Sequence, residues 1–295
     1  MKGATSNSRF SLVGWSALLA AFLMMRAAPM QAQERNEFTG NSSLFSSLPA
    51  AEEEQTAGSP AGSLQENQIP AGTILPVVLR SSLSFEKCKT GQILRGKIAQ
   101  DVPLGNGRKI RKGATVEGHV VEVTPATNGA EARVSIQFDK LNMAGEWIPI
   151  KTNLRALAGF MTVLEAGIPE ETPGEGSVDN WLPTIQIGGD SVYGVGGPVM
   201  SAEDTSKVIG KSVGDGVLVQ ASAKEGTKCR GAVDGNDNPQ ALWVFSSDAC
   251  GIYGIEHLKI VHAGRTAPEG TIVLASEKAK LSLRYGDGLL LRVNR

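Results

Sequence analysis

Several features that would point to a function are missing from this sequence. No hydrophobic run reaches the roughly 20 residues that a membrane-spanning helix needs, which excludes a polytopic membrane protein. Charge of one sign is absent too: 29 Lys and Arg stand against 30 Asp and Glu, which argues against nucleic-acid binding driven by net charge. The three cysteines form no CxxC pair, and His119, His257 and His262 lack clustered partners. We therefore expect no zinc site and no cofactor.

Glycine, in contrast, is abundant. The chain carries 35 Gly among 295 residues, whereas the usual frequency is about 7%. No Gly-X-Y period is present, so a collagen-like chain is excluded. The excess predicts many turns between short strands.

The first 32 residues have the layout of a secretory signal peptide. They contain Lys2, Arg9 and Arg26 but no acid, and residues 10–25 form an apolar core. Ala32 supplies the small residue that cleavage requires. We expect cleavage after Ala32 and export to the periplasm, the outer membrane or the exterior of a bacterium. The alternative is an uncleaved inner-membrane anchor.

Residues 33–68 have the composition of a disordered, acidic linker. They are rich in Ser, Ala, Gly and Glu, and they hold six Glu against one Arg. Such a segment has too little apolar surface to bury in a core.

Export changes the meaning of the cysteines, because thiols pair in an oxidising compartment. Cys229 and Cys250 each lie close to a glycine in one segment, and we predict a disulfide between them. Cys88 is then left as a free thiol. Its neighbours Lys87 and Lys89 would lower its pKa and make it reactive, but we favour an incidental thiol at the surface or at a strand end.

From residue 69 onward the hydrophobic pattern has a period of two, which is typical of half-buried strands. The strongest hairpin signal is the Asn128-Gly129 dipeptide between two alternating segments. The expected fold class is all-β, a barrel or sandwich of many short antiparallel strands. The expected strands are 73–79, 93–102, a short strand between 107 and 112, 115–123, 132–138, 147–151, 182–187, 191–195, 216–222, 241–246, 258–262, 271–275, 280–285 and 288–293.

Residues 153–167 are the only mature segment with a helical pattern, since apolar residues fall on one helical face. This segment separates two β regions of the mature chain. We expect a β module over 69–152, a helix and loop connection over 153–180, and a disulfide-stapled β region over 181–295. The last region either packs on the first or completes the same barrel.

The β module resembles a known family. The order and spacing of its glycine and strand motifs resemble the carboxy-terminal β-barrel of the TrbI-like proteins of type IV secretion and conjugation systems. The resemblance implies a periplasmic, oligomerising barrel in an outer-membrane-associated assembly, with no enzymatic activity and with envelope proteins or further copies of the chain as partners. The segments that carry it are 69–79, 91–102, 110–118, 134–141 and 148–150.

One short motif suggests hydrolysis. Residues 210–214 read Gly-Lys-Ser-Val-Gly, which fits the nucleophile elbow that exposes a serine at a strand-to-helix turn. The flanking sequence instead predicts strand, turn and strand, so we favour a hairpin over a nucleophilic Ser212. The same Lys211-Ser212 pair does not end a phosphate loop, because Thr205 stands where that loop needs glycine. We therefore expect no nucleotide.

Two polar clusters are candidate ion sites. Asp234, Asn236 and Asp237 offer oxygen ligands for a hard cation, although Asx turns explain such a cluster better. The basic run is a candidate patch for an anionic polysaccharide or lipid head group, although we favour a solvated strand entry. It comprises Arg108, Lys109, Arg111 and Lys112.

These observations favour an exported, non-enzymatic cell-envelope protein with a structural or assembly role. The second hypothesis is a periplasmic or surface binding module for glycan or another envelope polymer. The third is a serine hydrolase that uses Ser212. Membrane contact is expected only through the signal segment or an assembled complex.

Overall fold

The computed structural model describes residues 68–105, 107–127, 130–167, 183–189, 191–193, 197–201, 204, 206–214, 216–219, 239–278 and 280–294. The signal peptide expected over 1–32, nearly all of the linker expected over 33–68 and the loop expected after the helix lie outside these residues. So do Cys229, Asp234, Asn236 and Asp237.

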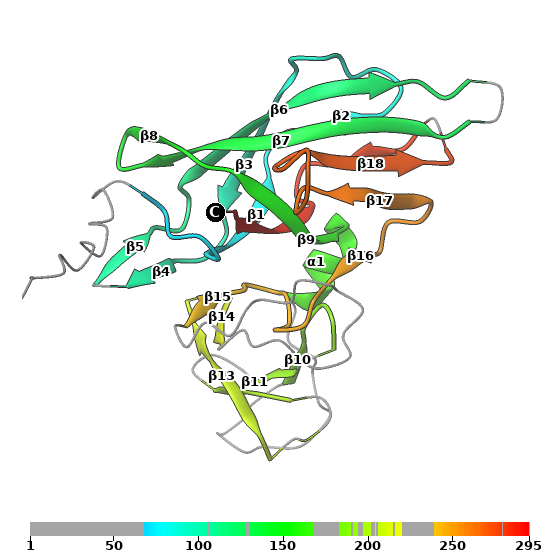
Figure 1. Ribbon diagram of the computed structural model, residues 1–295. Coiled ribbons are helices and arrows are strands. Elements are labelled where there is room, and N and C mark those ends of the chain that lie inside the picture. Colours follow the sequence, from blue (N-terminus) through cyan, green and yellow to red (C-terminus); the bar gives the residue numbers. More distant parts are fainter. Residues whose placement is uncertain are drawn as a thin grey trace, which may run out of the picture. The chain divides into compact units, whose positions relative to one another are not determined.

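The largest element is a ten-stranded sheet with the order β16-β9-β20-β1-β3-β6-β7-β18-β17, in which β8 pairs with β7 as a branch. All its pairs are antiparallel except β16 with β9. Figure 1 shows β1, coloured near the start of the chain, beside strands from its end. The bounds are β1 Ile74–Leu79, β3 Ile93–Ile98, β6 Thr115–Thr124, β7 Ala132–Met143, β8 Glu146–Pro149, β9 Thr152–Ala158, β16 Gly251–Tyr253, β17 Leu258–Ala263, β18 Ile272–Ser276 and β20 Gly288–Val293.

The remaining strands form three smaller sheets. A six-stranded sheet runs in chain order from β10 to β15, and β2 pairs with β19 and β4 with β5. Their bounds are β2 Leu83–Ser84, β4 Val102–Gly105, β5 Arg108–Ile110, β10 Pro183–Ile185, β11 Ser191–Tyr193, β12 Pro198–Met200, β13 Val208–Val213, β14 Gly216–Val219, β15 Gln240–Ala241 and β19 Ser282–Leu283. The all-β prediction is confirmed, and the hairpin expected around Asn128-Gly129 is the pair β6 and β7.

The large sheet joins both halves of the mature sequence. Strand β20 lies between β1 and β9, and β18 pairs with β7. The strands expected over 69–152 therefore do not close on themselves but share one sheet with β16, β17, β18 and β20. The two edge strands of this sheet, β16 and β17, are joined by the short connection 254–257.

The helix predicted over 153–167 is wrong in its first half. Residues Thr152–Ala158 form β9, and only Phe160–Ala166 form the helix α1. Every residue of β9 is buried, because the strand lies between β20 and β16 and both of its faces are covered. A strand that is buried on both faces shows no polar alternation, so its apolar spacing also fits a helix.

Two hydrophobic clusters form the core. The larger lies within the curved main sheet and includes Leu75, Leu94, Phe138 and Leu291. The second packs the outer face of β9, β20 and β1 against the six-stranded sheet and includes Phe245. Among the described residues, no helix has the length and apolar character to cross a membrane.

Candidate functional site

A groove of about 590 Å³ lies at one end of the large sheet. Three pieces of chain line it: the start of α1, the connection between β16 and β17, and the segment that leads from β18 to β20. Figure 1 shows α1 beside β16 and β9. The groove therefore combines residues that lie more than 100 positions apart in the sequence.

Asp287 holds the first turn of α1 in place. Gly159, the residue before the helix, has no side chain to cap it. Instead the Phe160 backbone N–H donates to Asp287 Oδ1 at 2.8 Å, and the Arg284 N–H donates to Oδ2 at 2.7 Å. Burial raises the pKa of Asp287, and these two N–H donors and the Arg284 charge oppose that rise. The carboxyl group thus joins α1 to the turn before β20.

Two apolar side chains of α1 are exposed beside the groove. Phe160 is 42% exposed and Met161 is 58% exposed, although both are large hydrophobic residues. The Phe160 ring lies against Gly286, where a Cβ atom would come within 2.4 Å of its Cδ2 atom. Gly286 also has a φ of +93°, which only glycine adopts readily. The glycine therefore provides the surface on which the ring rests.

Three cations also line the groove. Lys278, Lys280 and Arg284 are all exposed, and within the described part of the chain none of them forms an ion pair. The charges of Lys278 and Lys280 are therefore available to an anionic group, whereas the charge of Arg284 also acts on Asp287. A ligand in the groove would meet these charges and the apolar side chains of α1 together.

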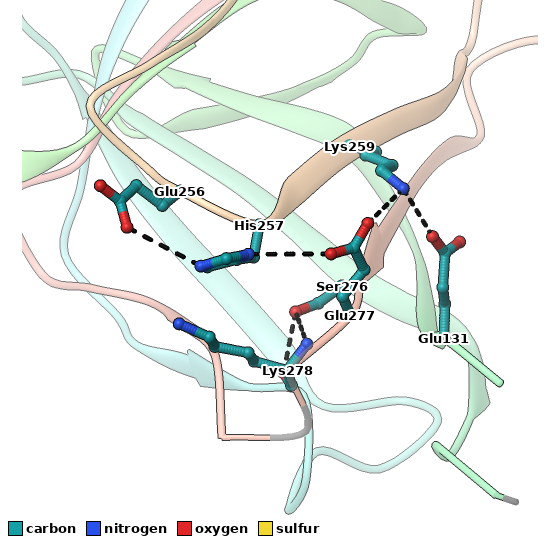
Figure 2. A network of polar contacts seen from close by, with 7 residues as sticks. All are labelled: Glu131, Glu256, His257, Lys259, Ser276, Glu277 and Lys278. Carbon is teal, nitrogen blue, oxygen red and sulfur yellow. Dashed lines mark hydrogen bonds and ion pairs between the residues drawn. The ribbon is translucent and has the colours of Figure 1, made fainter. Parts of the chain in front are cut away.

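A chain of ion pairs leads from the large sheet to the wall of the groove (Figure 2). Lys259 Nζ on β17 donates to Glu131 Oε1 at 2.8 Å and to Glu277 Oε1 at 2.6 Å. Glu277 Oε2 lies 3.7 Å from His257 Nδ1, and Glu256 Oε2 lies 3.8 Å from His257 Nε2. Bonding to Lys259 lowers the pKa of Glu277. The network holds His257 between two carboxylates.

A second feature of Figure 2 fixes the start of the cationic segment. The buried Ser276 Oγ donates to the Lys278 carbonyl at 2.8 Å and accepts from the Lys278 N–H at 3.0 Å. This turn determines where the Lys278 side chain leaves the sheet.

The structure places Ser212 away from the context that a nucleophile elbow needs. Ser212 lies in β13 opposite Val217 of β14, and its N–H donates to the Gly197 carbonyl at 3.1 Å. The segment is a hairpin, as the flanking sequence predicts. It does not lead into a helix.

The basic run is partly neutralised by one acid. Asp101 Oδ2 accepts from Lys109 Nζ at 2.5 Å, and its Oδ1 accepts from the Lys112 N–H at 2.7 Å. These two bonds hold the pKa of Asp101 below its usual range. Arg108 and Lys109 lie on β5, and Arg111 follows it. None of the four basic residues lines the groove.

Cys88 carries a free thiol that is buried in the larger core cluster. Burial raises the pKa of this thiol, which is the opposite of the shift that a reactive Cys88 beside Lys87 and Lys89 would need. Cys88 is therefore not at the surface. The disulfide between Cys229 and Cys250 stays a prediction, because Cys229 lies outside the described residues. Among the described residues, no group of three or more His, Cys, Asp or Glu could hold a metal ion.

Sequence reasoning missed the groove. The only signal for its cationic side is the spacing of Lys278, Lys280 and Arg284 around a short strand, and we read that segment only as β structure. Nothing in the sequence links Asp287 to α1. No protein-family model matches the chain, and no curated protein matches it significantly.

Proposed function

We propose that the protein is an exported, non-enzymatic component of the bacterial cell envelope that binds an acidic polypeptide segment in its groove. The observation that carries the proposal is the pairing of exposed apolar residues on α1 with three cations that lack ion-pair partners in the described chain. An acidic segment with apolar side chains complements both features. The role is one of assembly, as the resemblance to TrbI-like proteins implies.

The composition of the lining favours a polypeptide over a glycan. A neutral glycan carries no charge that would complement the three cations of the groove. Among the described residues that line the groove there is no Asn, Gln, Trp or Tyr, and Ser282 is the one hydroxyl. Phe160, Met161, Ile255 and Leu281 instead provide apolar contacts. A volume of about 590 Å³ lies within the range of roughly 300–1,000 Å³ that is usual for binding pockets.

The fixed walls of the groove also suit a docking role. Its walls are fixed by the Asp287 bonds to α1 and by the Ser276 turn, so little ordering is required when a partner binds. Preorganised walls reduce the entropic cost of association.

The test places a photo-crosslinking amino acid at Met161 in the full-length chain and expresses it in the native envelope. We expect a discrete crosslinked product of higher mass that is lost when Lys278, Lys280 and Arg284 are all changed to Glu. The same crosslinker at Val208, which is 59% exposed on β13, is the matched control. Equal products at both positions, or a product that survives charge reversal, would count against the proposal. Retention on purified cell-wall glycan that depends on the same three cations would replace the polypeptide with a glycan.

Export is tested separately. The N-terminus of the protein in the envelope fraction should begin at Gln33, the residue after Ala32. A mature protein that still begins at Met1 would refute cleavage and favour an anchored form.

A further inference from the structure

Strand β19 has one edge that pairs with β2 and a second edge that is free. Among the described residues, β19 and β2 form a two-stranded sheet, and β19 pairs with no other strand. The register places Ser282 opposite Ser84, and the Phe85 N–H donates to the Leu281 carbonyl at 3.0 Å. Bonded and non-bonded pairs alternate along an antiparallel ladder. The backbone N–H and carbonyl groups of Ser282 therefore point away from β2.

This free edge faces the groove. Residues two apart in a strand direct their N–H groups to the same edge, so the next N–H on this edge is that of Arg284. It donates to Asp287 Oδ2 at 2.7 Å, and Ser282, Arg284 and Asp287 all line the groove. Asp287 thus closes one end of the edge. No described residue bonds to the N–H or the carbonyl of Ser282, so both groups are available to a ligand.

The side chains near this edge suit an extended segment that carries both acidic and apolar residues. Lys278 and Lys280 precede Ser282 on the same segment and are exposed, and Phe160 and Met161 of α1 line the same groove. Neighbouring side chains of an extended chain point in opposite directions, so such a segment can present acidic and apolar residues in alternation. A helical ligand keeps its backbone bonds internal, and it would leave the backbone groups of Ser282 without partners.

We propose that the groove binds its partner as an extended polypeptide strand, which pairs with the free edge of β19 through the N–H and carbonyl groups of Ser282. When a strand adds to an exposed sheet edge, backbone hydrogen bonds supply affinity and alternate side chains supply specificity. The inference rests on the proposed role of the groove as a polypeptide site. It adds the conformation of the ligand and the alternating pattern of acidic and apolar residues that the ligand carries.

The first test follows amide hydrogen exchange in the full-length protein by NMR. The probe is an acetylated and amidated peptide of about six residues, the usual length of a strand, in which Glu and Val alternate. We expect exchange of the Ser282 N–H to slow by about tenfold or more at saturating peptide, because the new hydrogen bond protects it. The Phe85 N–H, which already donates to the Leu281 carbonyl, is the internal control and should not change. Bound peptide that leaves Ser282 unprotected would overturn strand addition.

The second test alters the peptide backbone and leaves the protein unchanged. Alternate N–H groups of an added strand point toward β19, and the others point away. Methylation of the backbone nitrogens of one residue type, Glu or Val, should therefore weaken binding by roughly three- to tenfold for the lost hydrogen bond. Methylation of the other type should have little effect and is the matched control. Equal effects of the two methylated peptides would contradict the pairing.

The third test removes the donor from the protein. Ser282→Pro deletes the N–H of the free edge and should weaken binding by roughly three- to tenfold. Ser84→Pro changes the opposite residue of the same pair and should bind as the wild type does. If Ser282→Pro fails to fold, the methylated peptides decide the question.

The outcomes separate this inference from the proposed function. Binding that is lost when Lys278 and Lys280 are changed to Glu, but that responds neither to Ser282→Pro nor to methylation, would overturn strand addition and leave the polypeptide site in place. No saturable binding of the peptide would count against both.

Discussion

The side chain of Gln100 pairs with the backbone of Val217 as a neighbouring strand would. Its Nε2 donates to the Val217 carbonyl at 2.9 Å, and its Oε1 accepts from the Val217 N–H at 3.2 Å. The same Oε1 accepts from the Trp243 N–H at 2.6 Å. Gln100 is 1% exposed and follows β3, so one amide group connects the large sheet to the six-stranded sheet.

Gln100→Leu should therefore destabilise the protein well beyond its change in volume. The substitution leaves the Val217 N–H and carbonyl and the Trp243 N–H without their partner, and each buried group left unsatisfied costs about 1–3 kcal/mol. We expect a loss of roughly 3 kcal/mol in the free energy of unfolding, measured by denaturant titration. Gln92→Leu is the control, because the Gln92 side chain makes one exposed bond, to the Lys89 N–H. Equal losses in the two variants would mean that the amide of Gln100 does not connect the sheets.

Gly286→Ala tests the contact beneath Phe160. The new methyl group would meet the Phe160 ring and would also force a side chain into the left-handed region of φ. We expect a destabilisation of about 1–3 kcal/mol. In a Phe160→Ala background the steric part of this cost should disappear while the backbone part remains. If the cost of Gly286→Ala is the same in both backgrounds, the ring does not rest on the glycine.

The contribution of Asp287 to the free energy of unfolding should depend on pH and be largest at acidic pH. Its pKa is raised in the folded protein, so the folded state binds the proton more tightly than the unfolded state does. The contribution of this group is then fully present below the ordinary carboxyl pKa of about 4, and it is lost as the pH rises through the raised pKa. We expect the stability advantage of the wild type over Asp287→Asn to decrease as the pH rises across that range. An advantage that instead grows with pH would show that the pKa is lowered.

The ion-pair network of Figure 2 should affect the pKa of Glu277 more than the free energy of unfolding. Lys259 and Glu277 are both exposed, with side chains 54% and 51% accessible, and exposed pairs contribute little. Lys259→Met removes the main cause of the lowered pKa of Glu277, so that pKa should rise toward its ordinary value in an NMR titration. Lys140→Met is the control, since Lys140 contacts Glu117 instead. A Glu277 pKa that does not move would mean that Lys259 is not the dominant partner.

Thiol counting tests the compartment and the burial of Cys88 together. Cys88 is buried and its pKa is raised, so in the folded protein it should react slowly with a thiol reagent. In denaturant without reductant, one reactive thiol per chain is expected if Cys229 and Cys250 are paired. Three thiols would refute the predicted disulfide and weaken the argument for export. Fast reaction of Cys88 in the folded protein would contradict its burial.

The strands that the sequence predicted best are those with one buried and one exposed face. Residues 115–123 alternate clearly, and the observed β6 extends them by one residue. The strand expected over 288–293 also agrees with β20, although its residues are nearly all buried, because the hydrophobic run is short and follows a turn. The sequence predicted the β13–β14 hairpin but placed its turn at residues 210–214, whereas β13 continues through Gly210, Lys211 and Ser212, which are half-buried or exposed. Hydrophobic pattern alone cannot reveal such a strand.

The groove and the burial of Arg155 were beyond prediction for a different reason. Asp287 caps a helix that begins 127 positions earlier in the chain, and Arg155 bonds to carbonyl groups more than 90 positions away. The residue types at these positions are ordinary. Their roles depend on which strands become neighbours, and local spacing carries no information about that choice.

The position of β20 has a consequence for the order in which the fold can assemble. This strand pairs with β1 on one side and β9 on the other, although about 200 residues separate it from β1 along the sequence. Pairing at such separation is slow, because the chain must close a very long loop before the contact stabilises it. Until residues 288–293 are available, β1 and β9 present unpaired edges that can associate with other chains. A protein that emerges N-terminus first, from a ribosome or through a membrane, would therefore need those edges to be shielded until its last strand arrives.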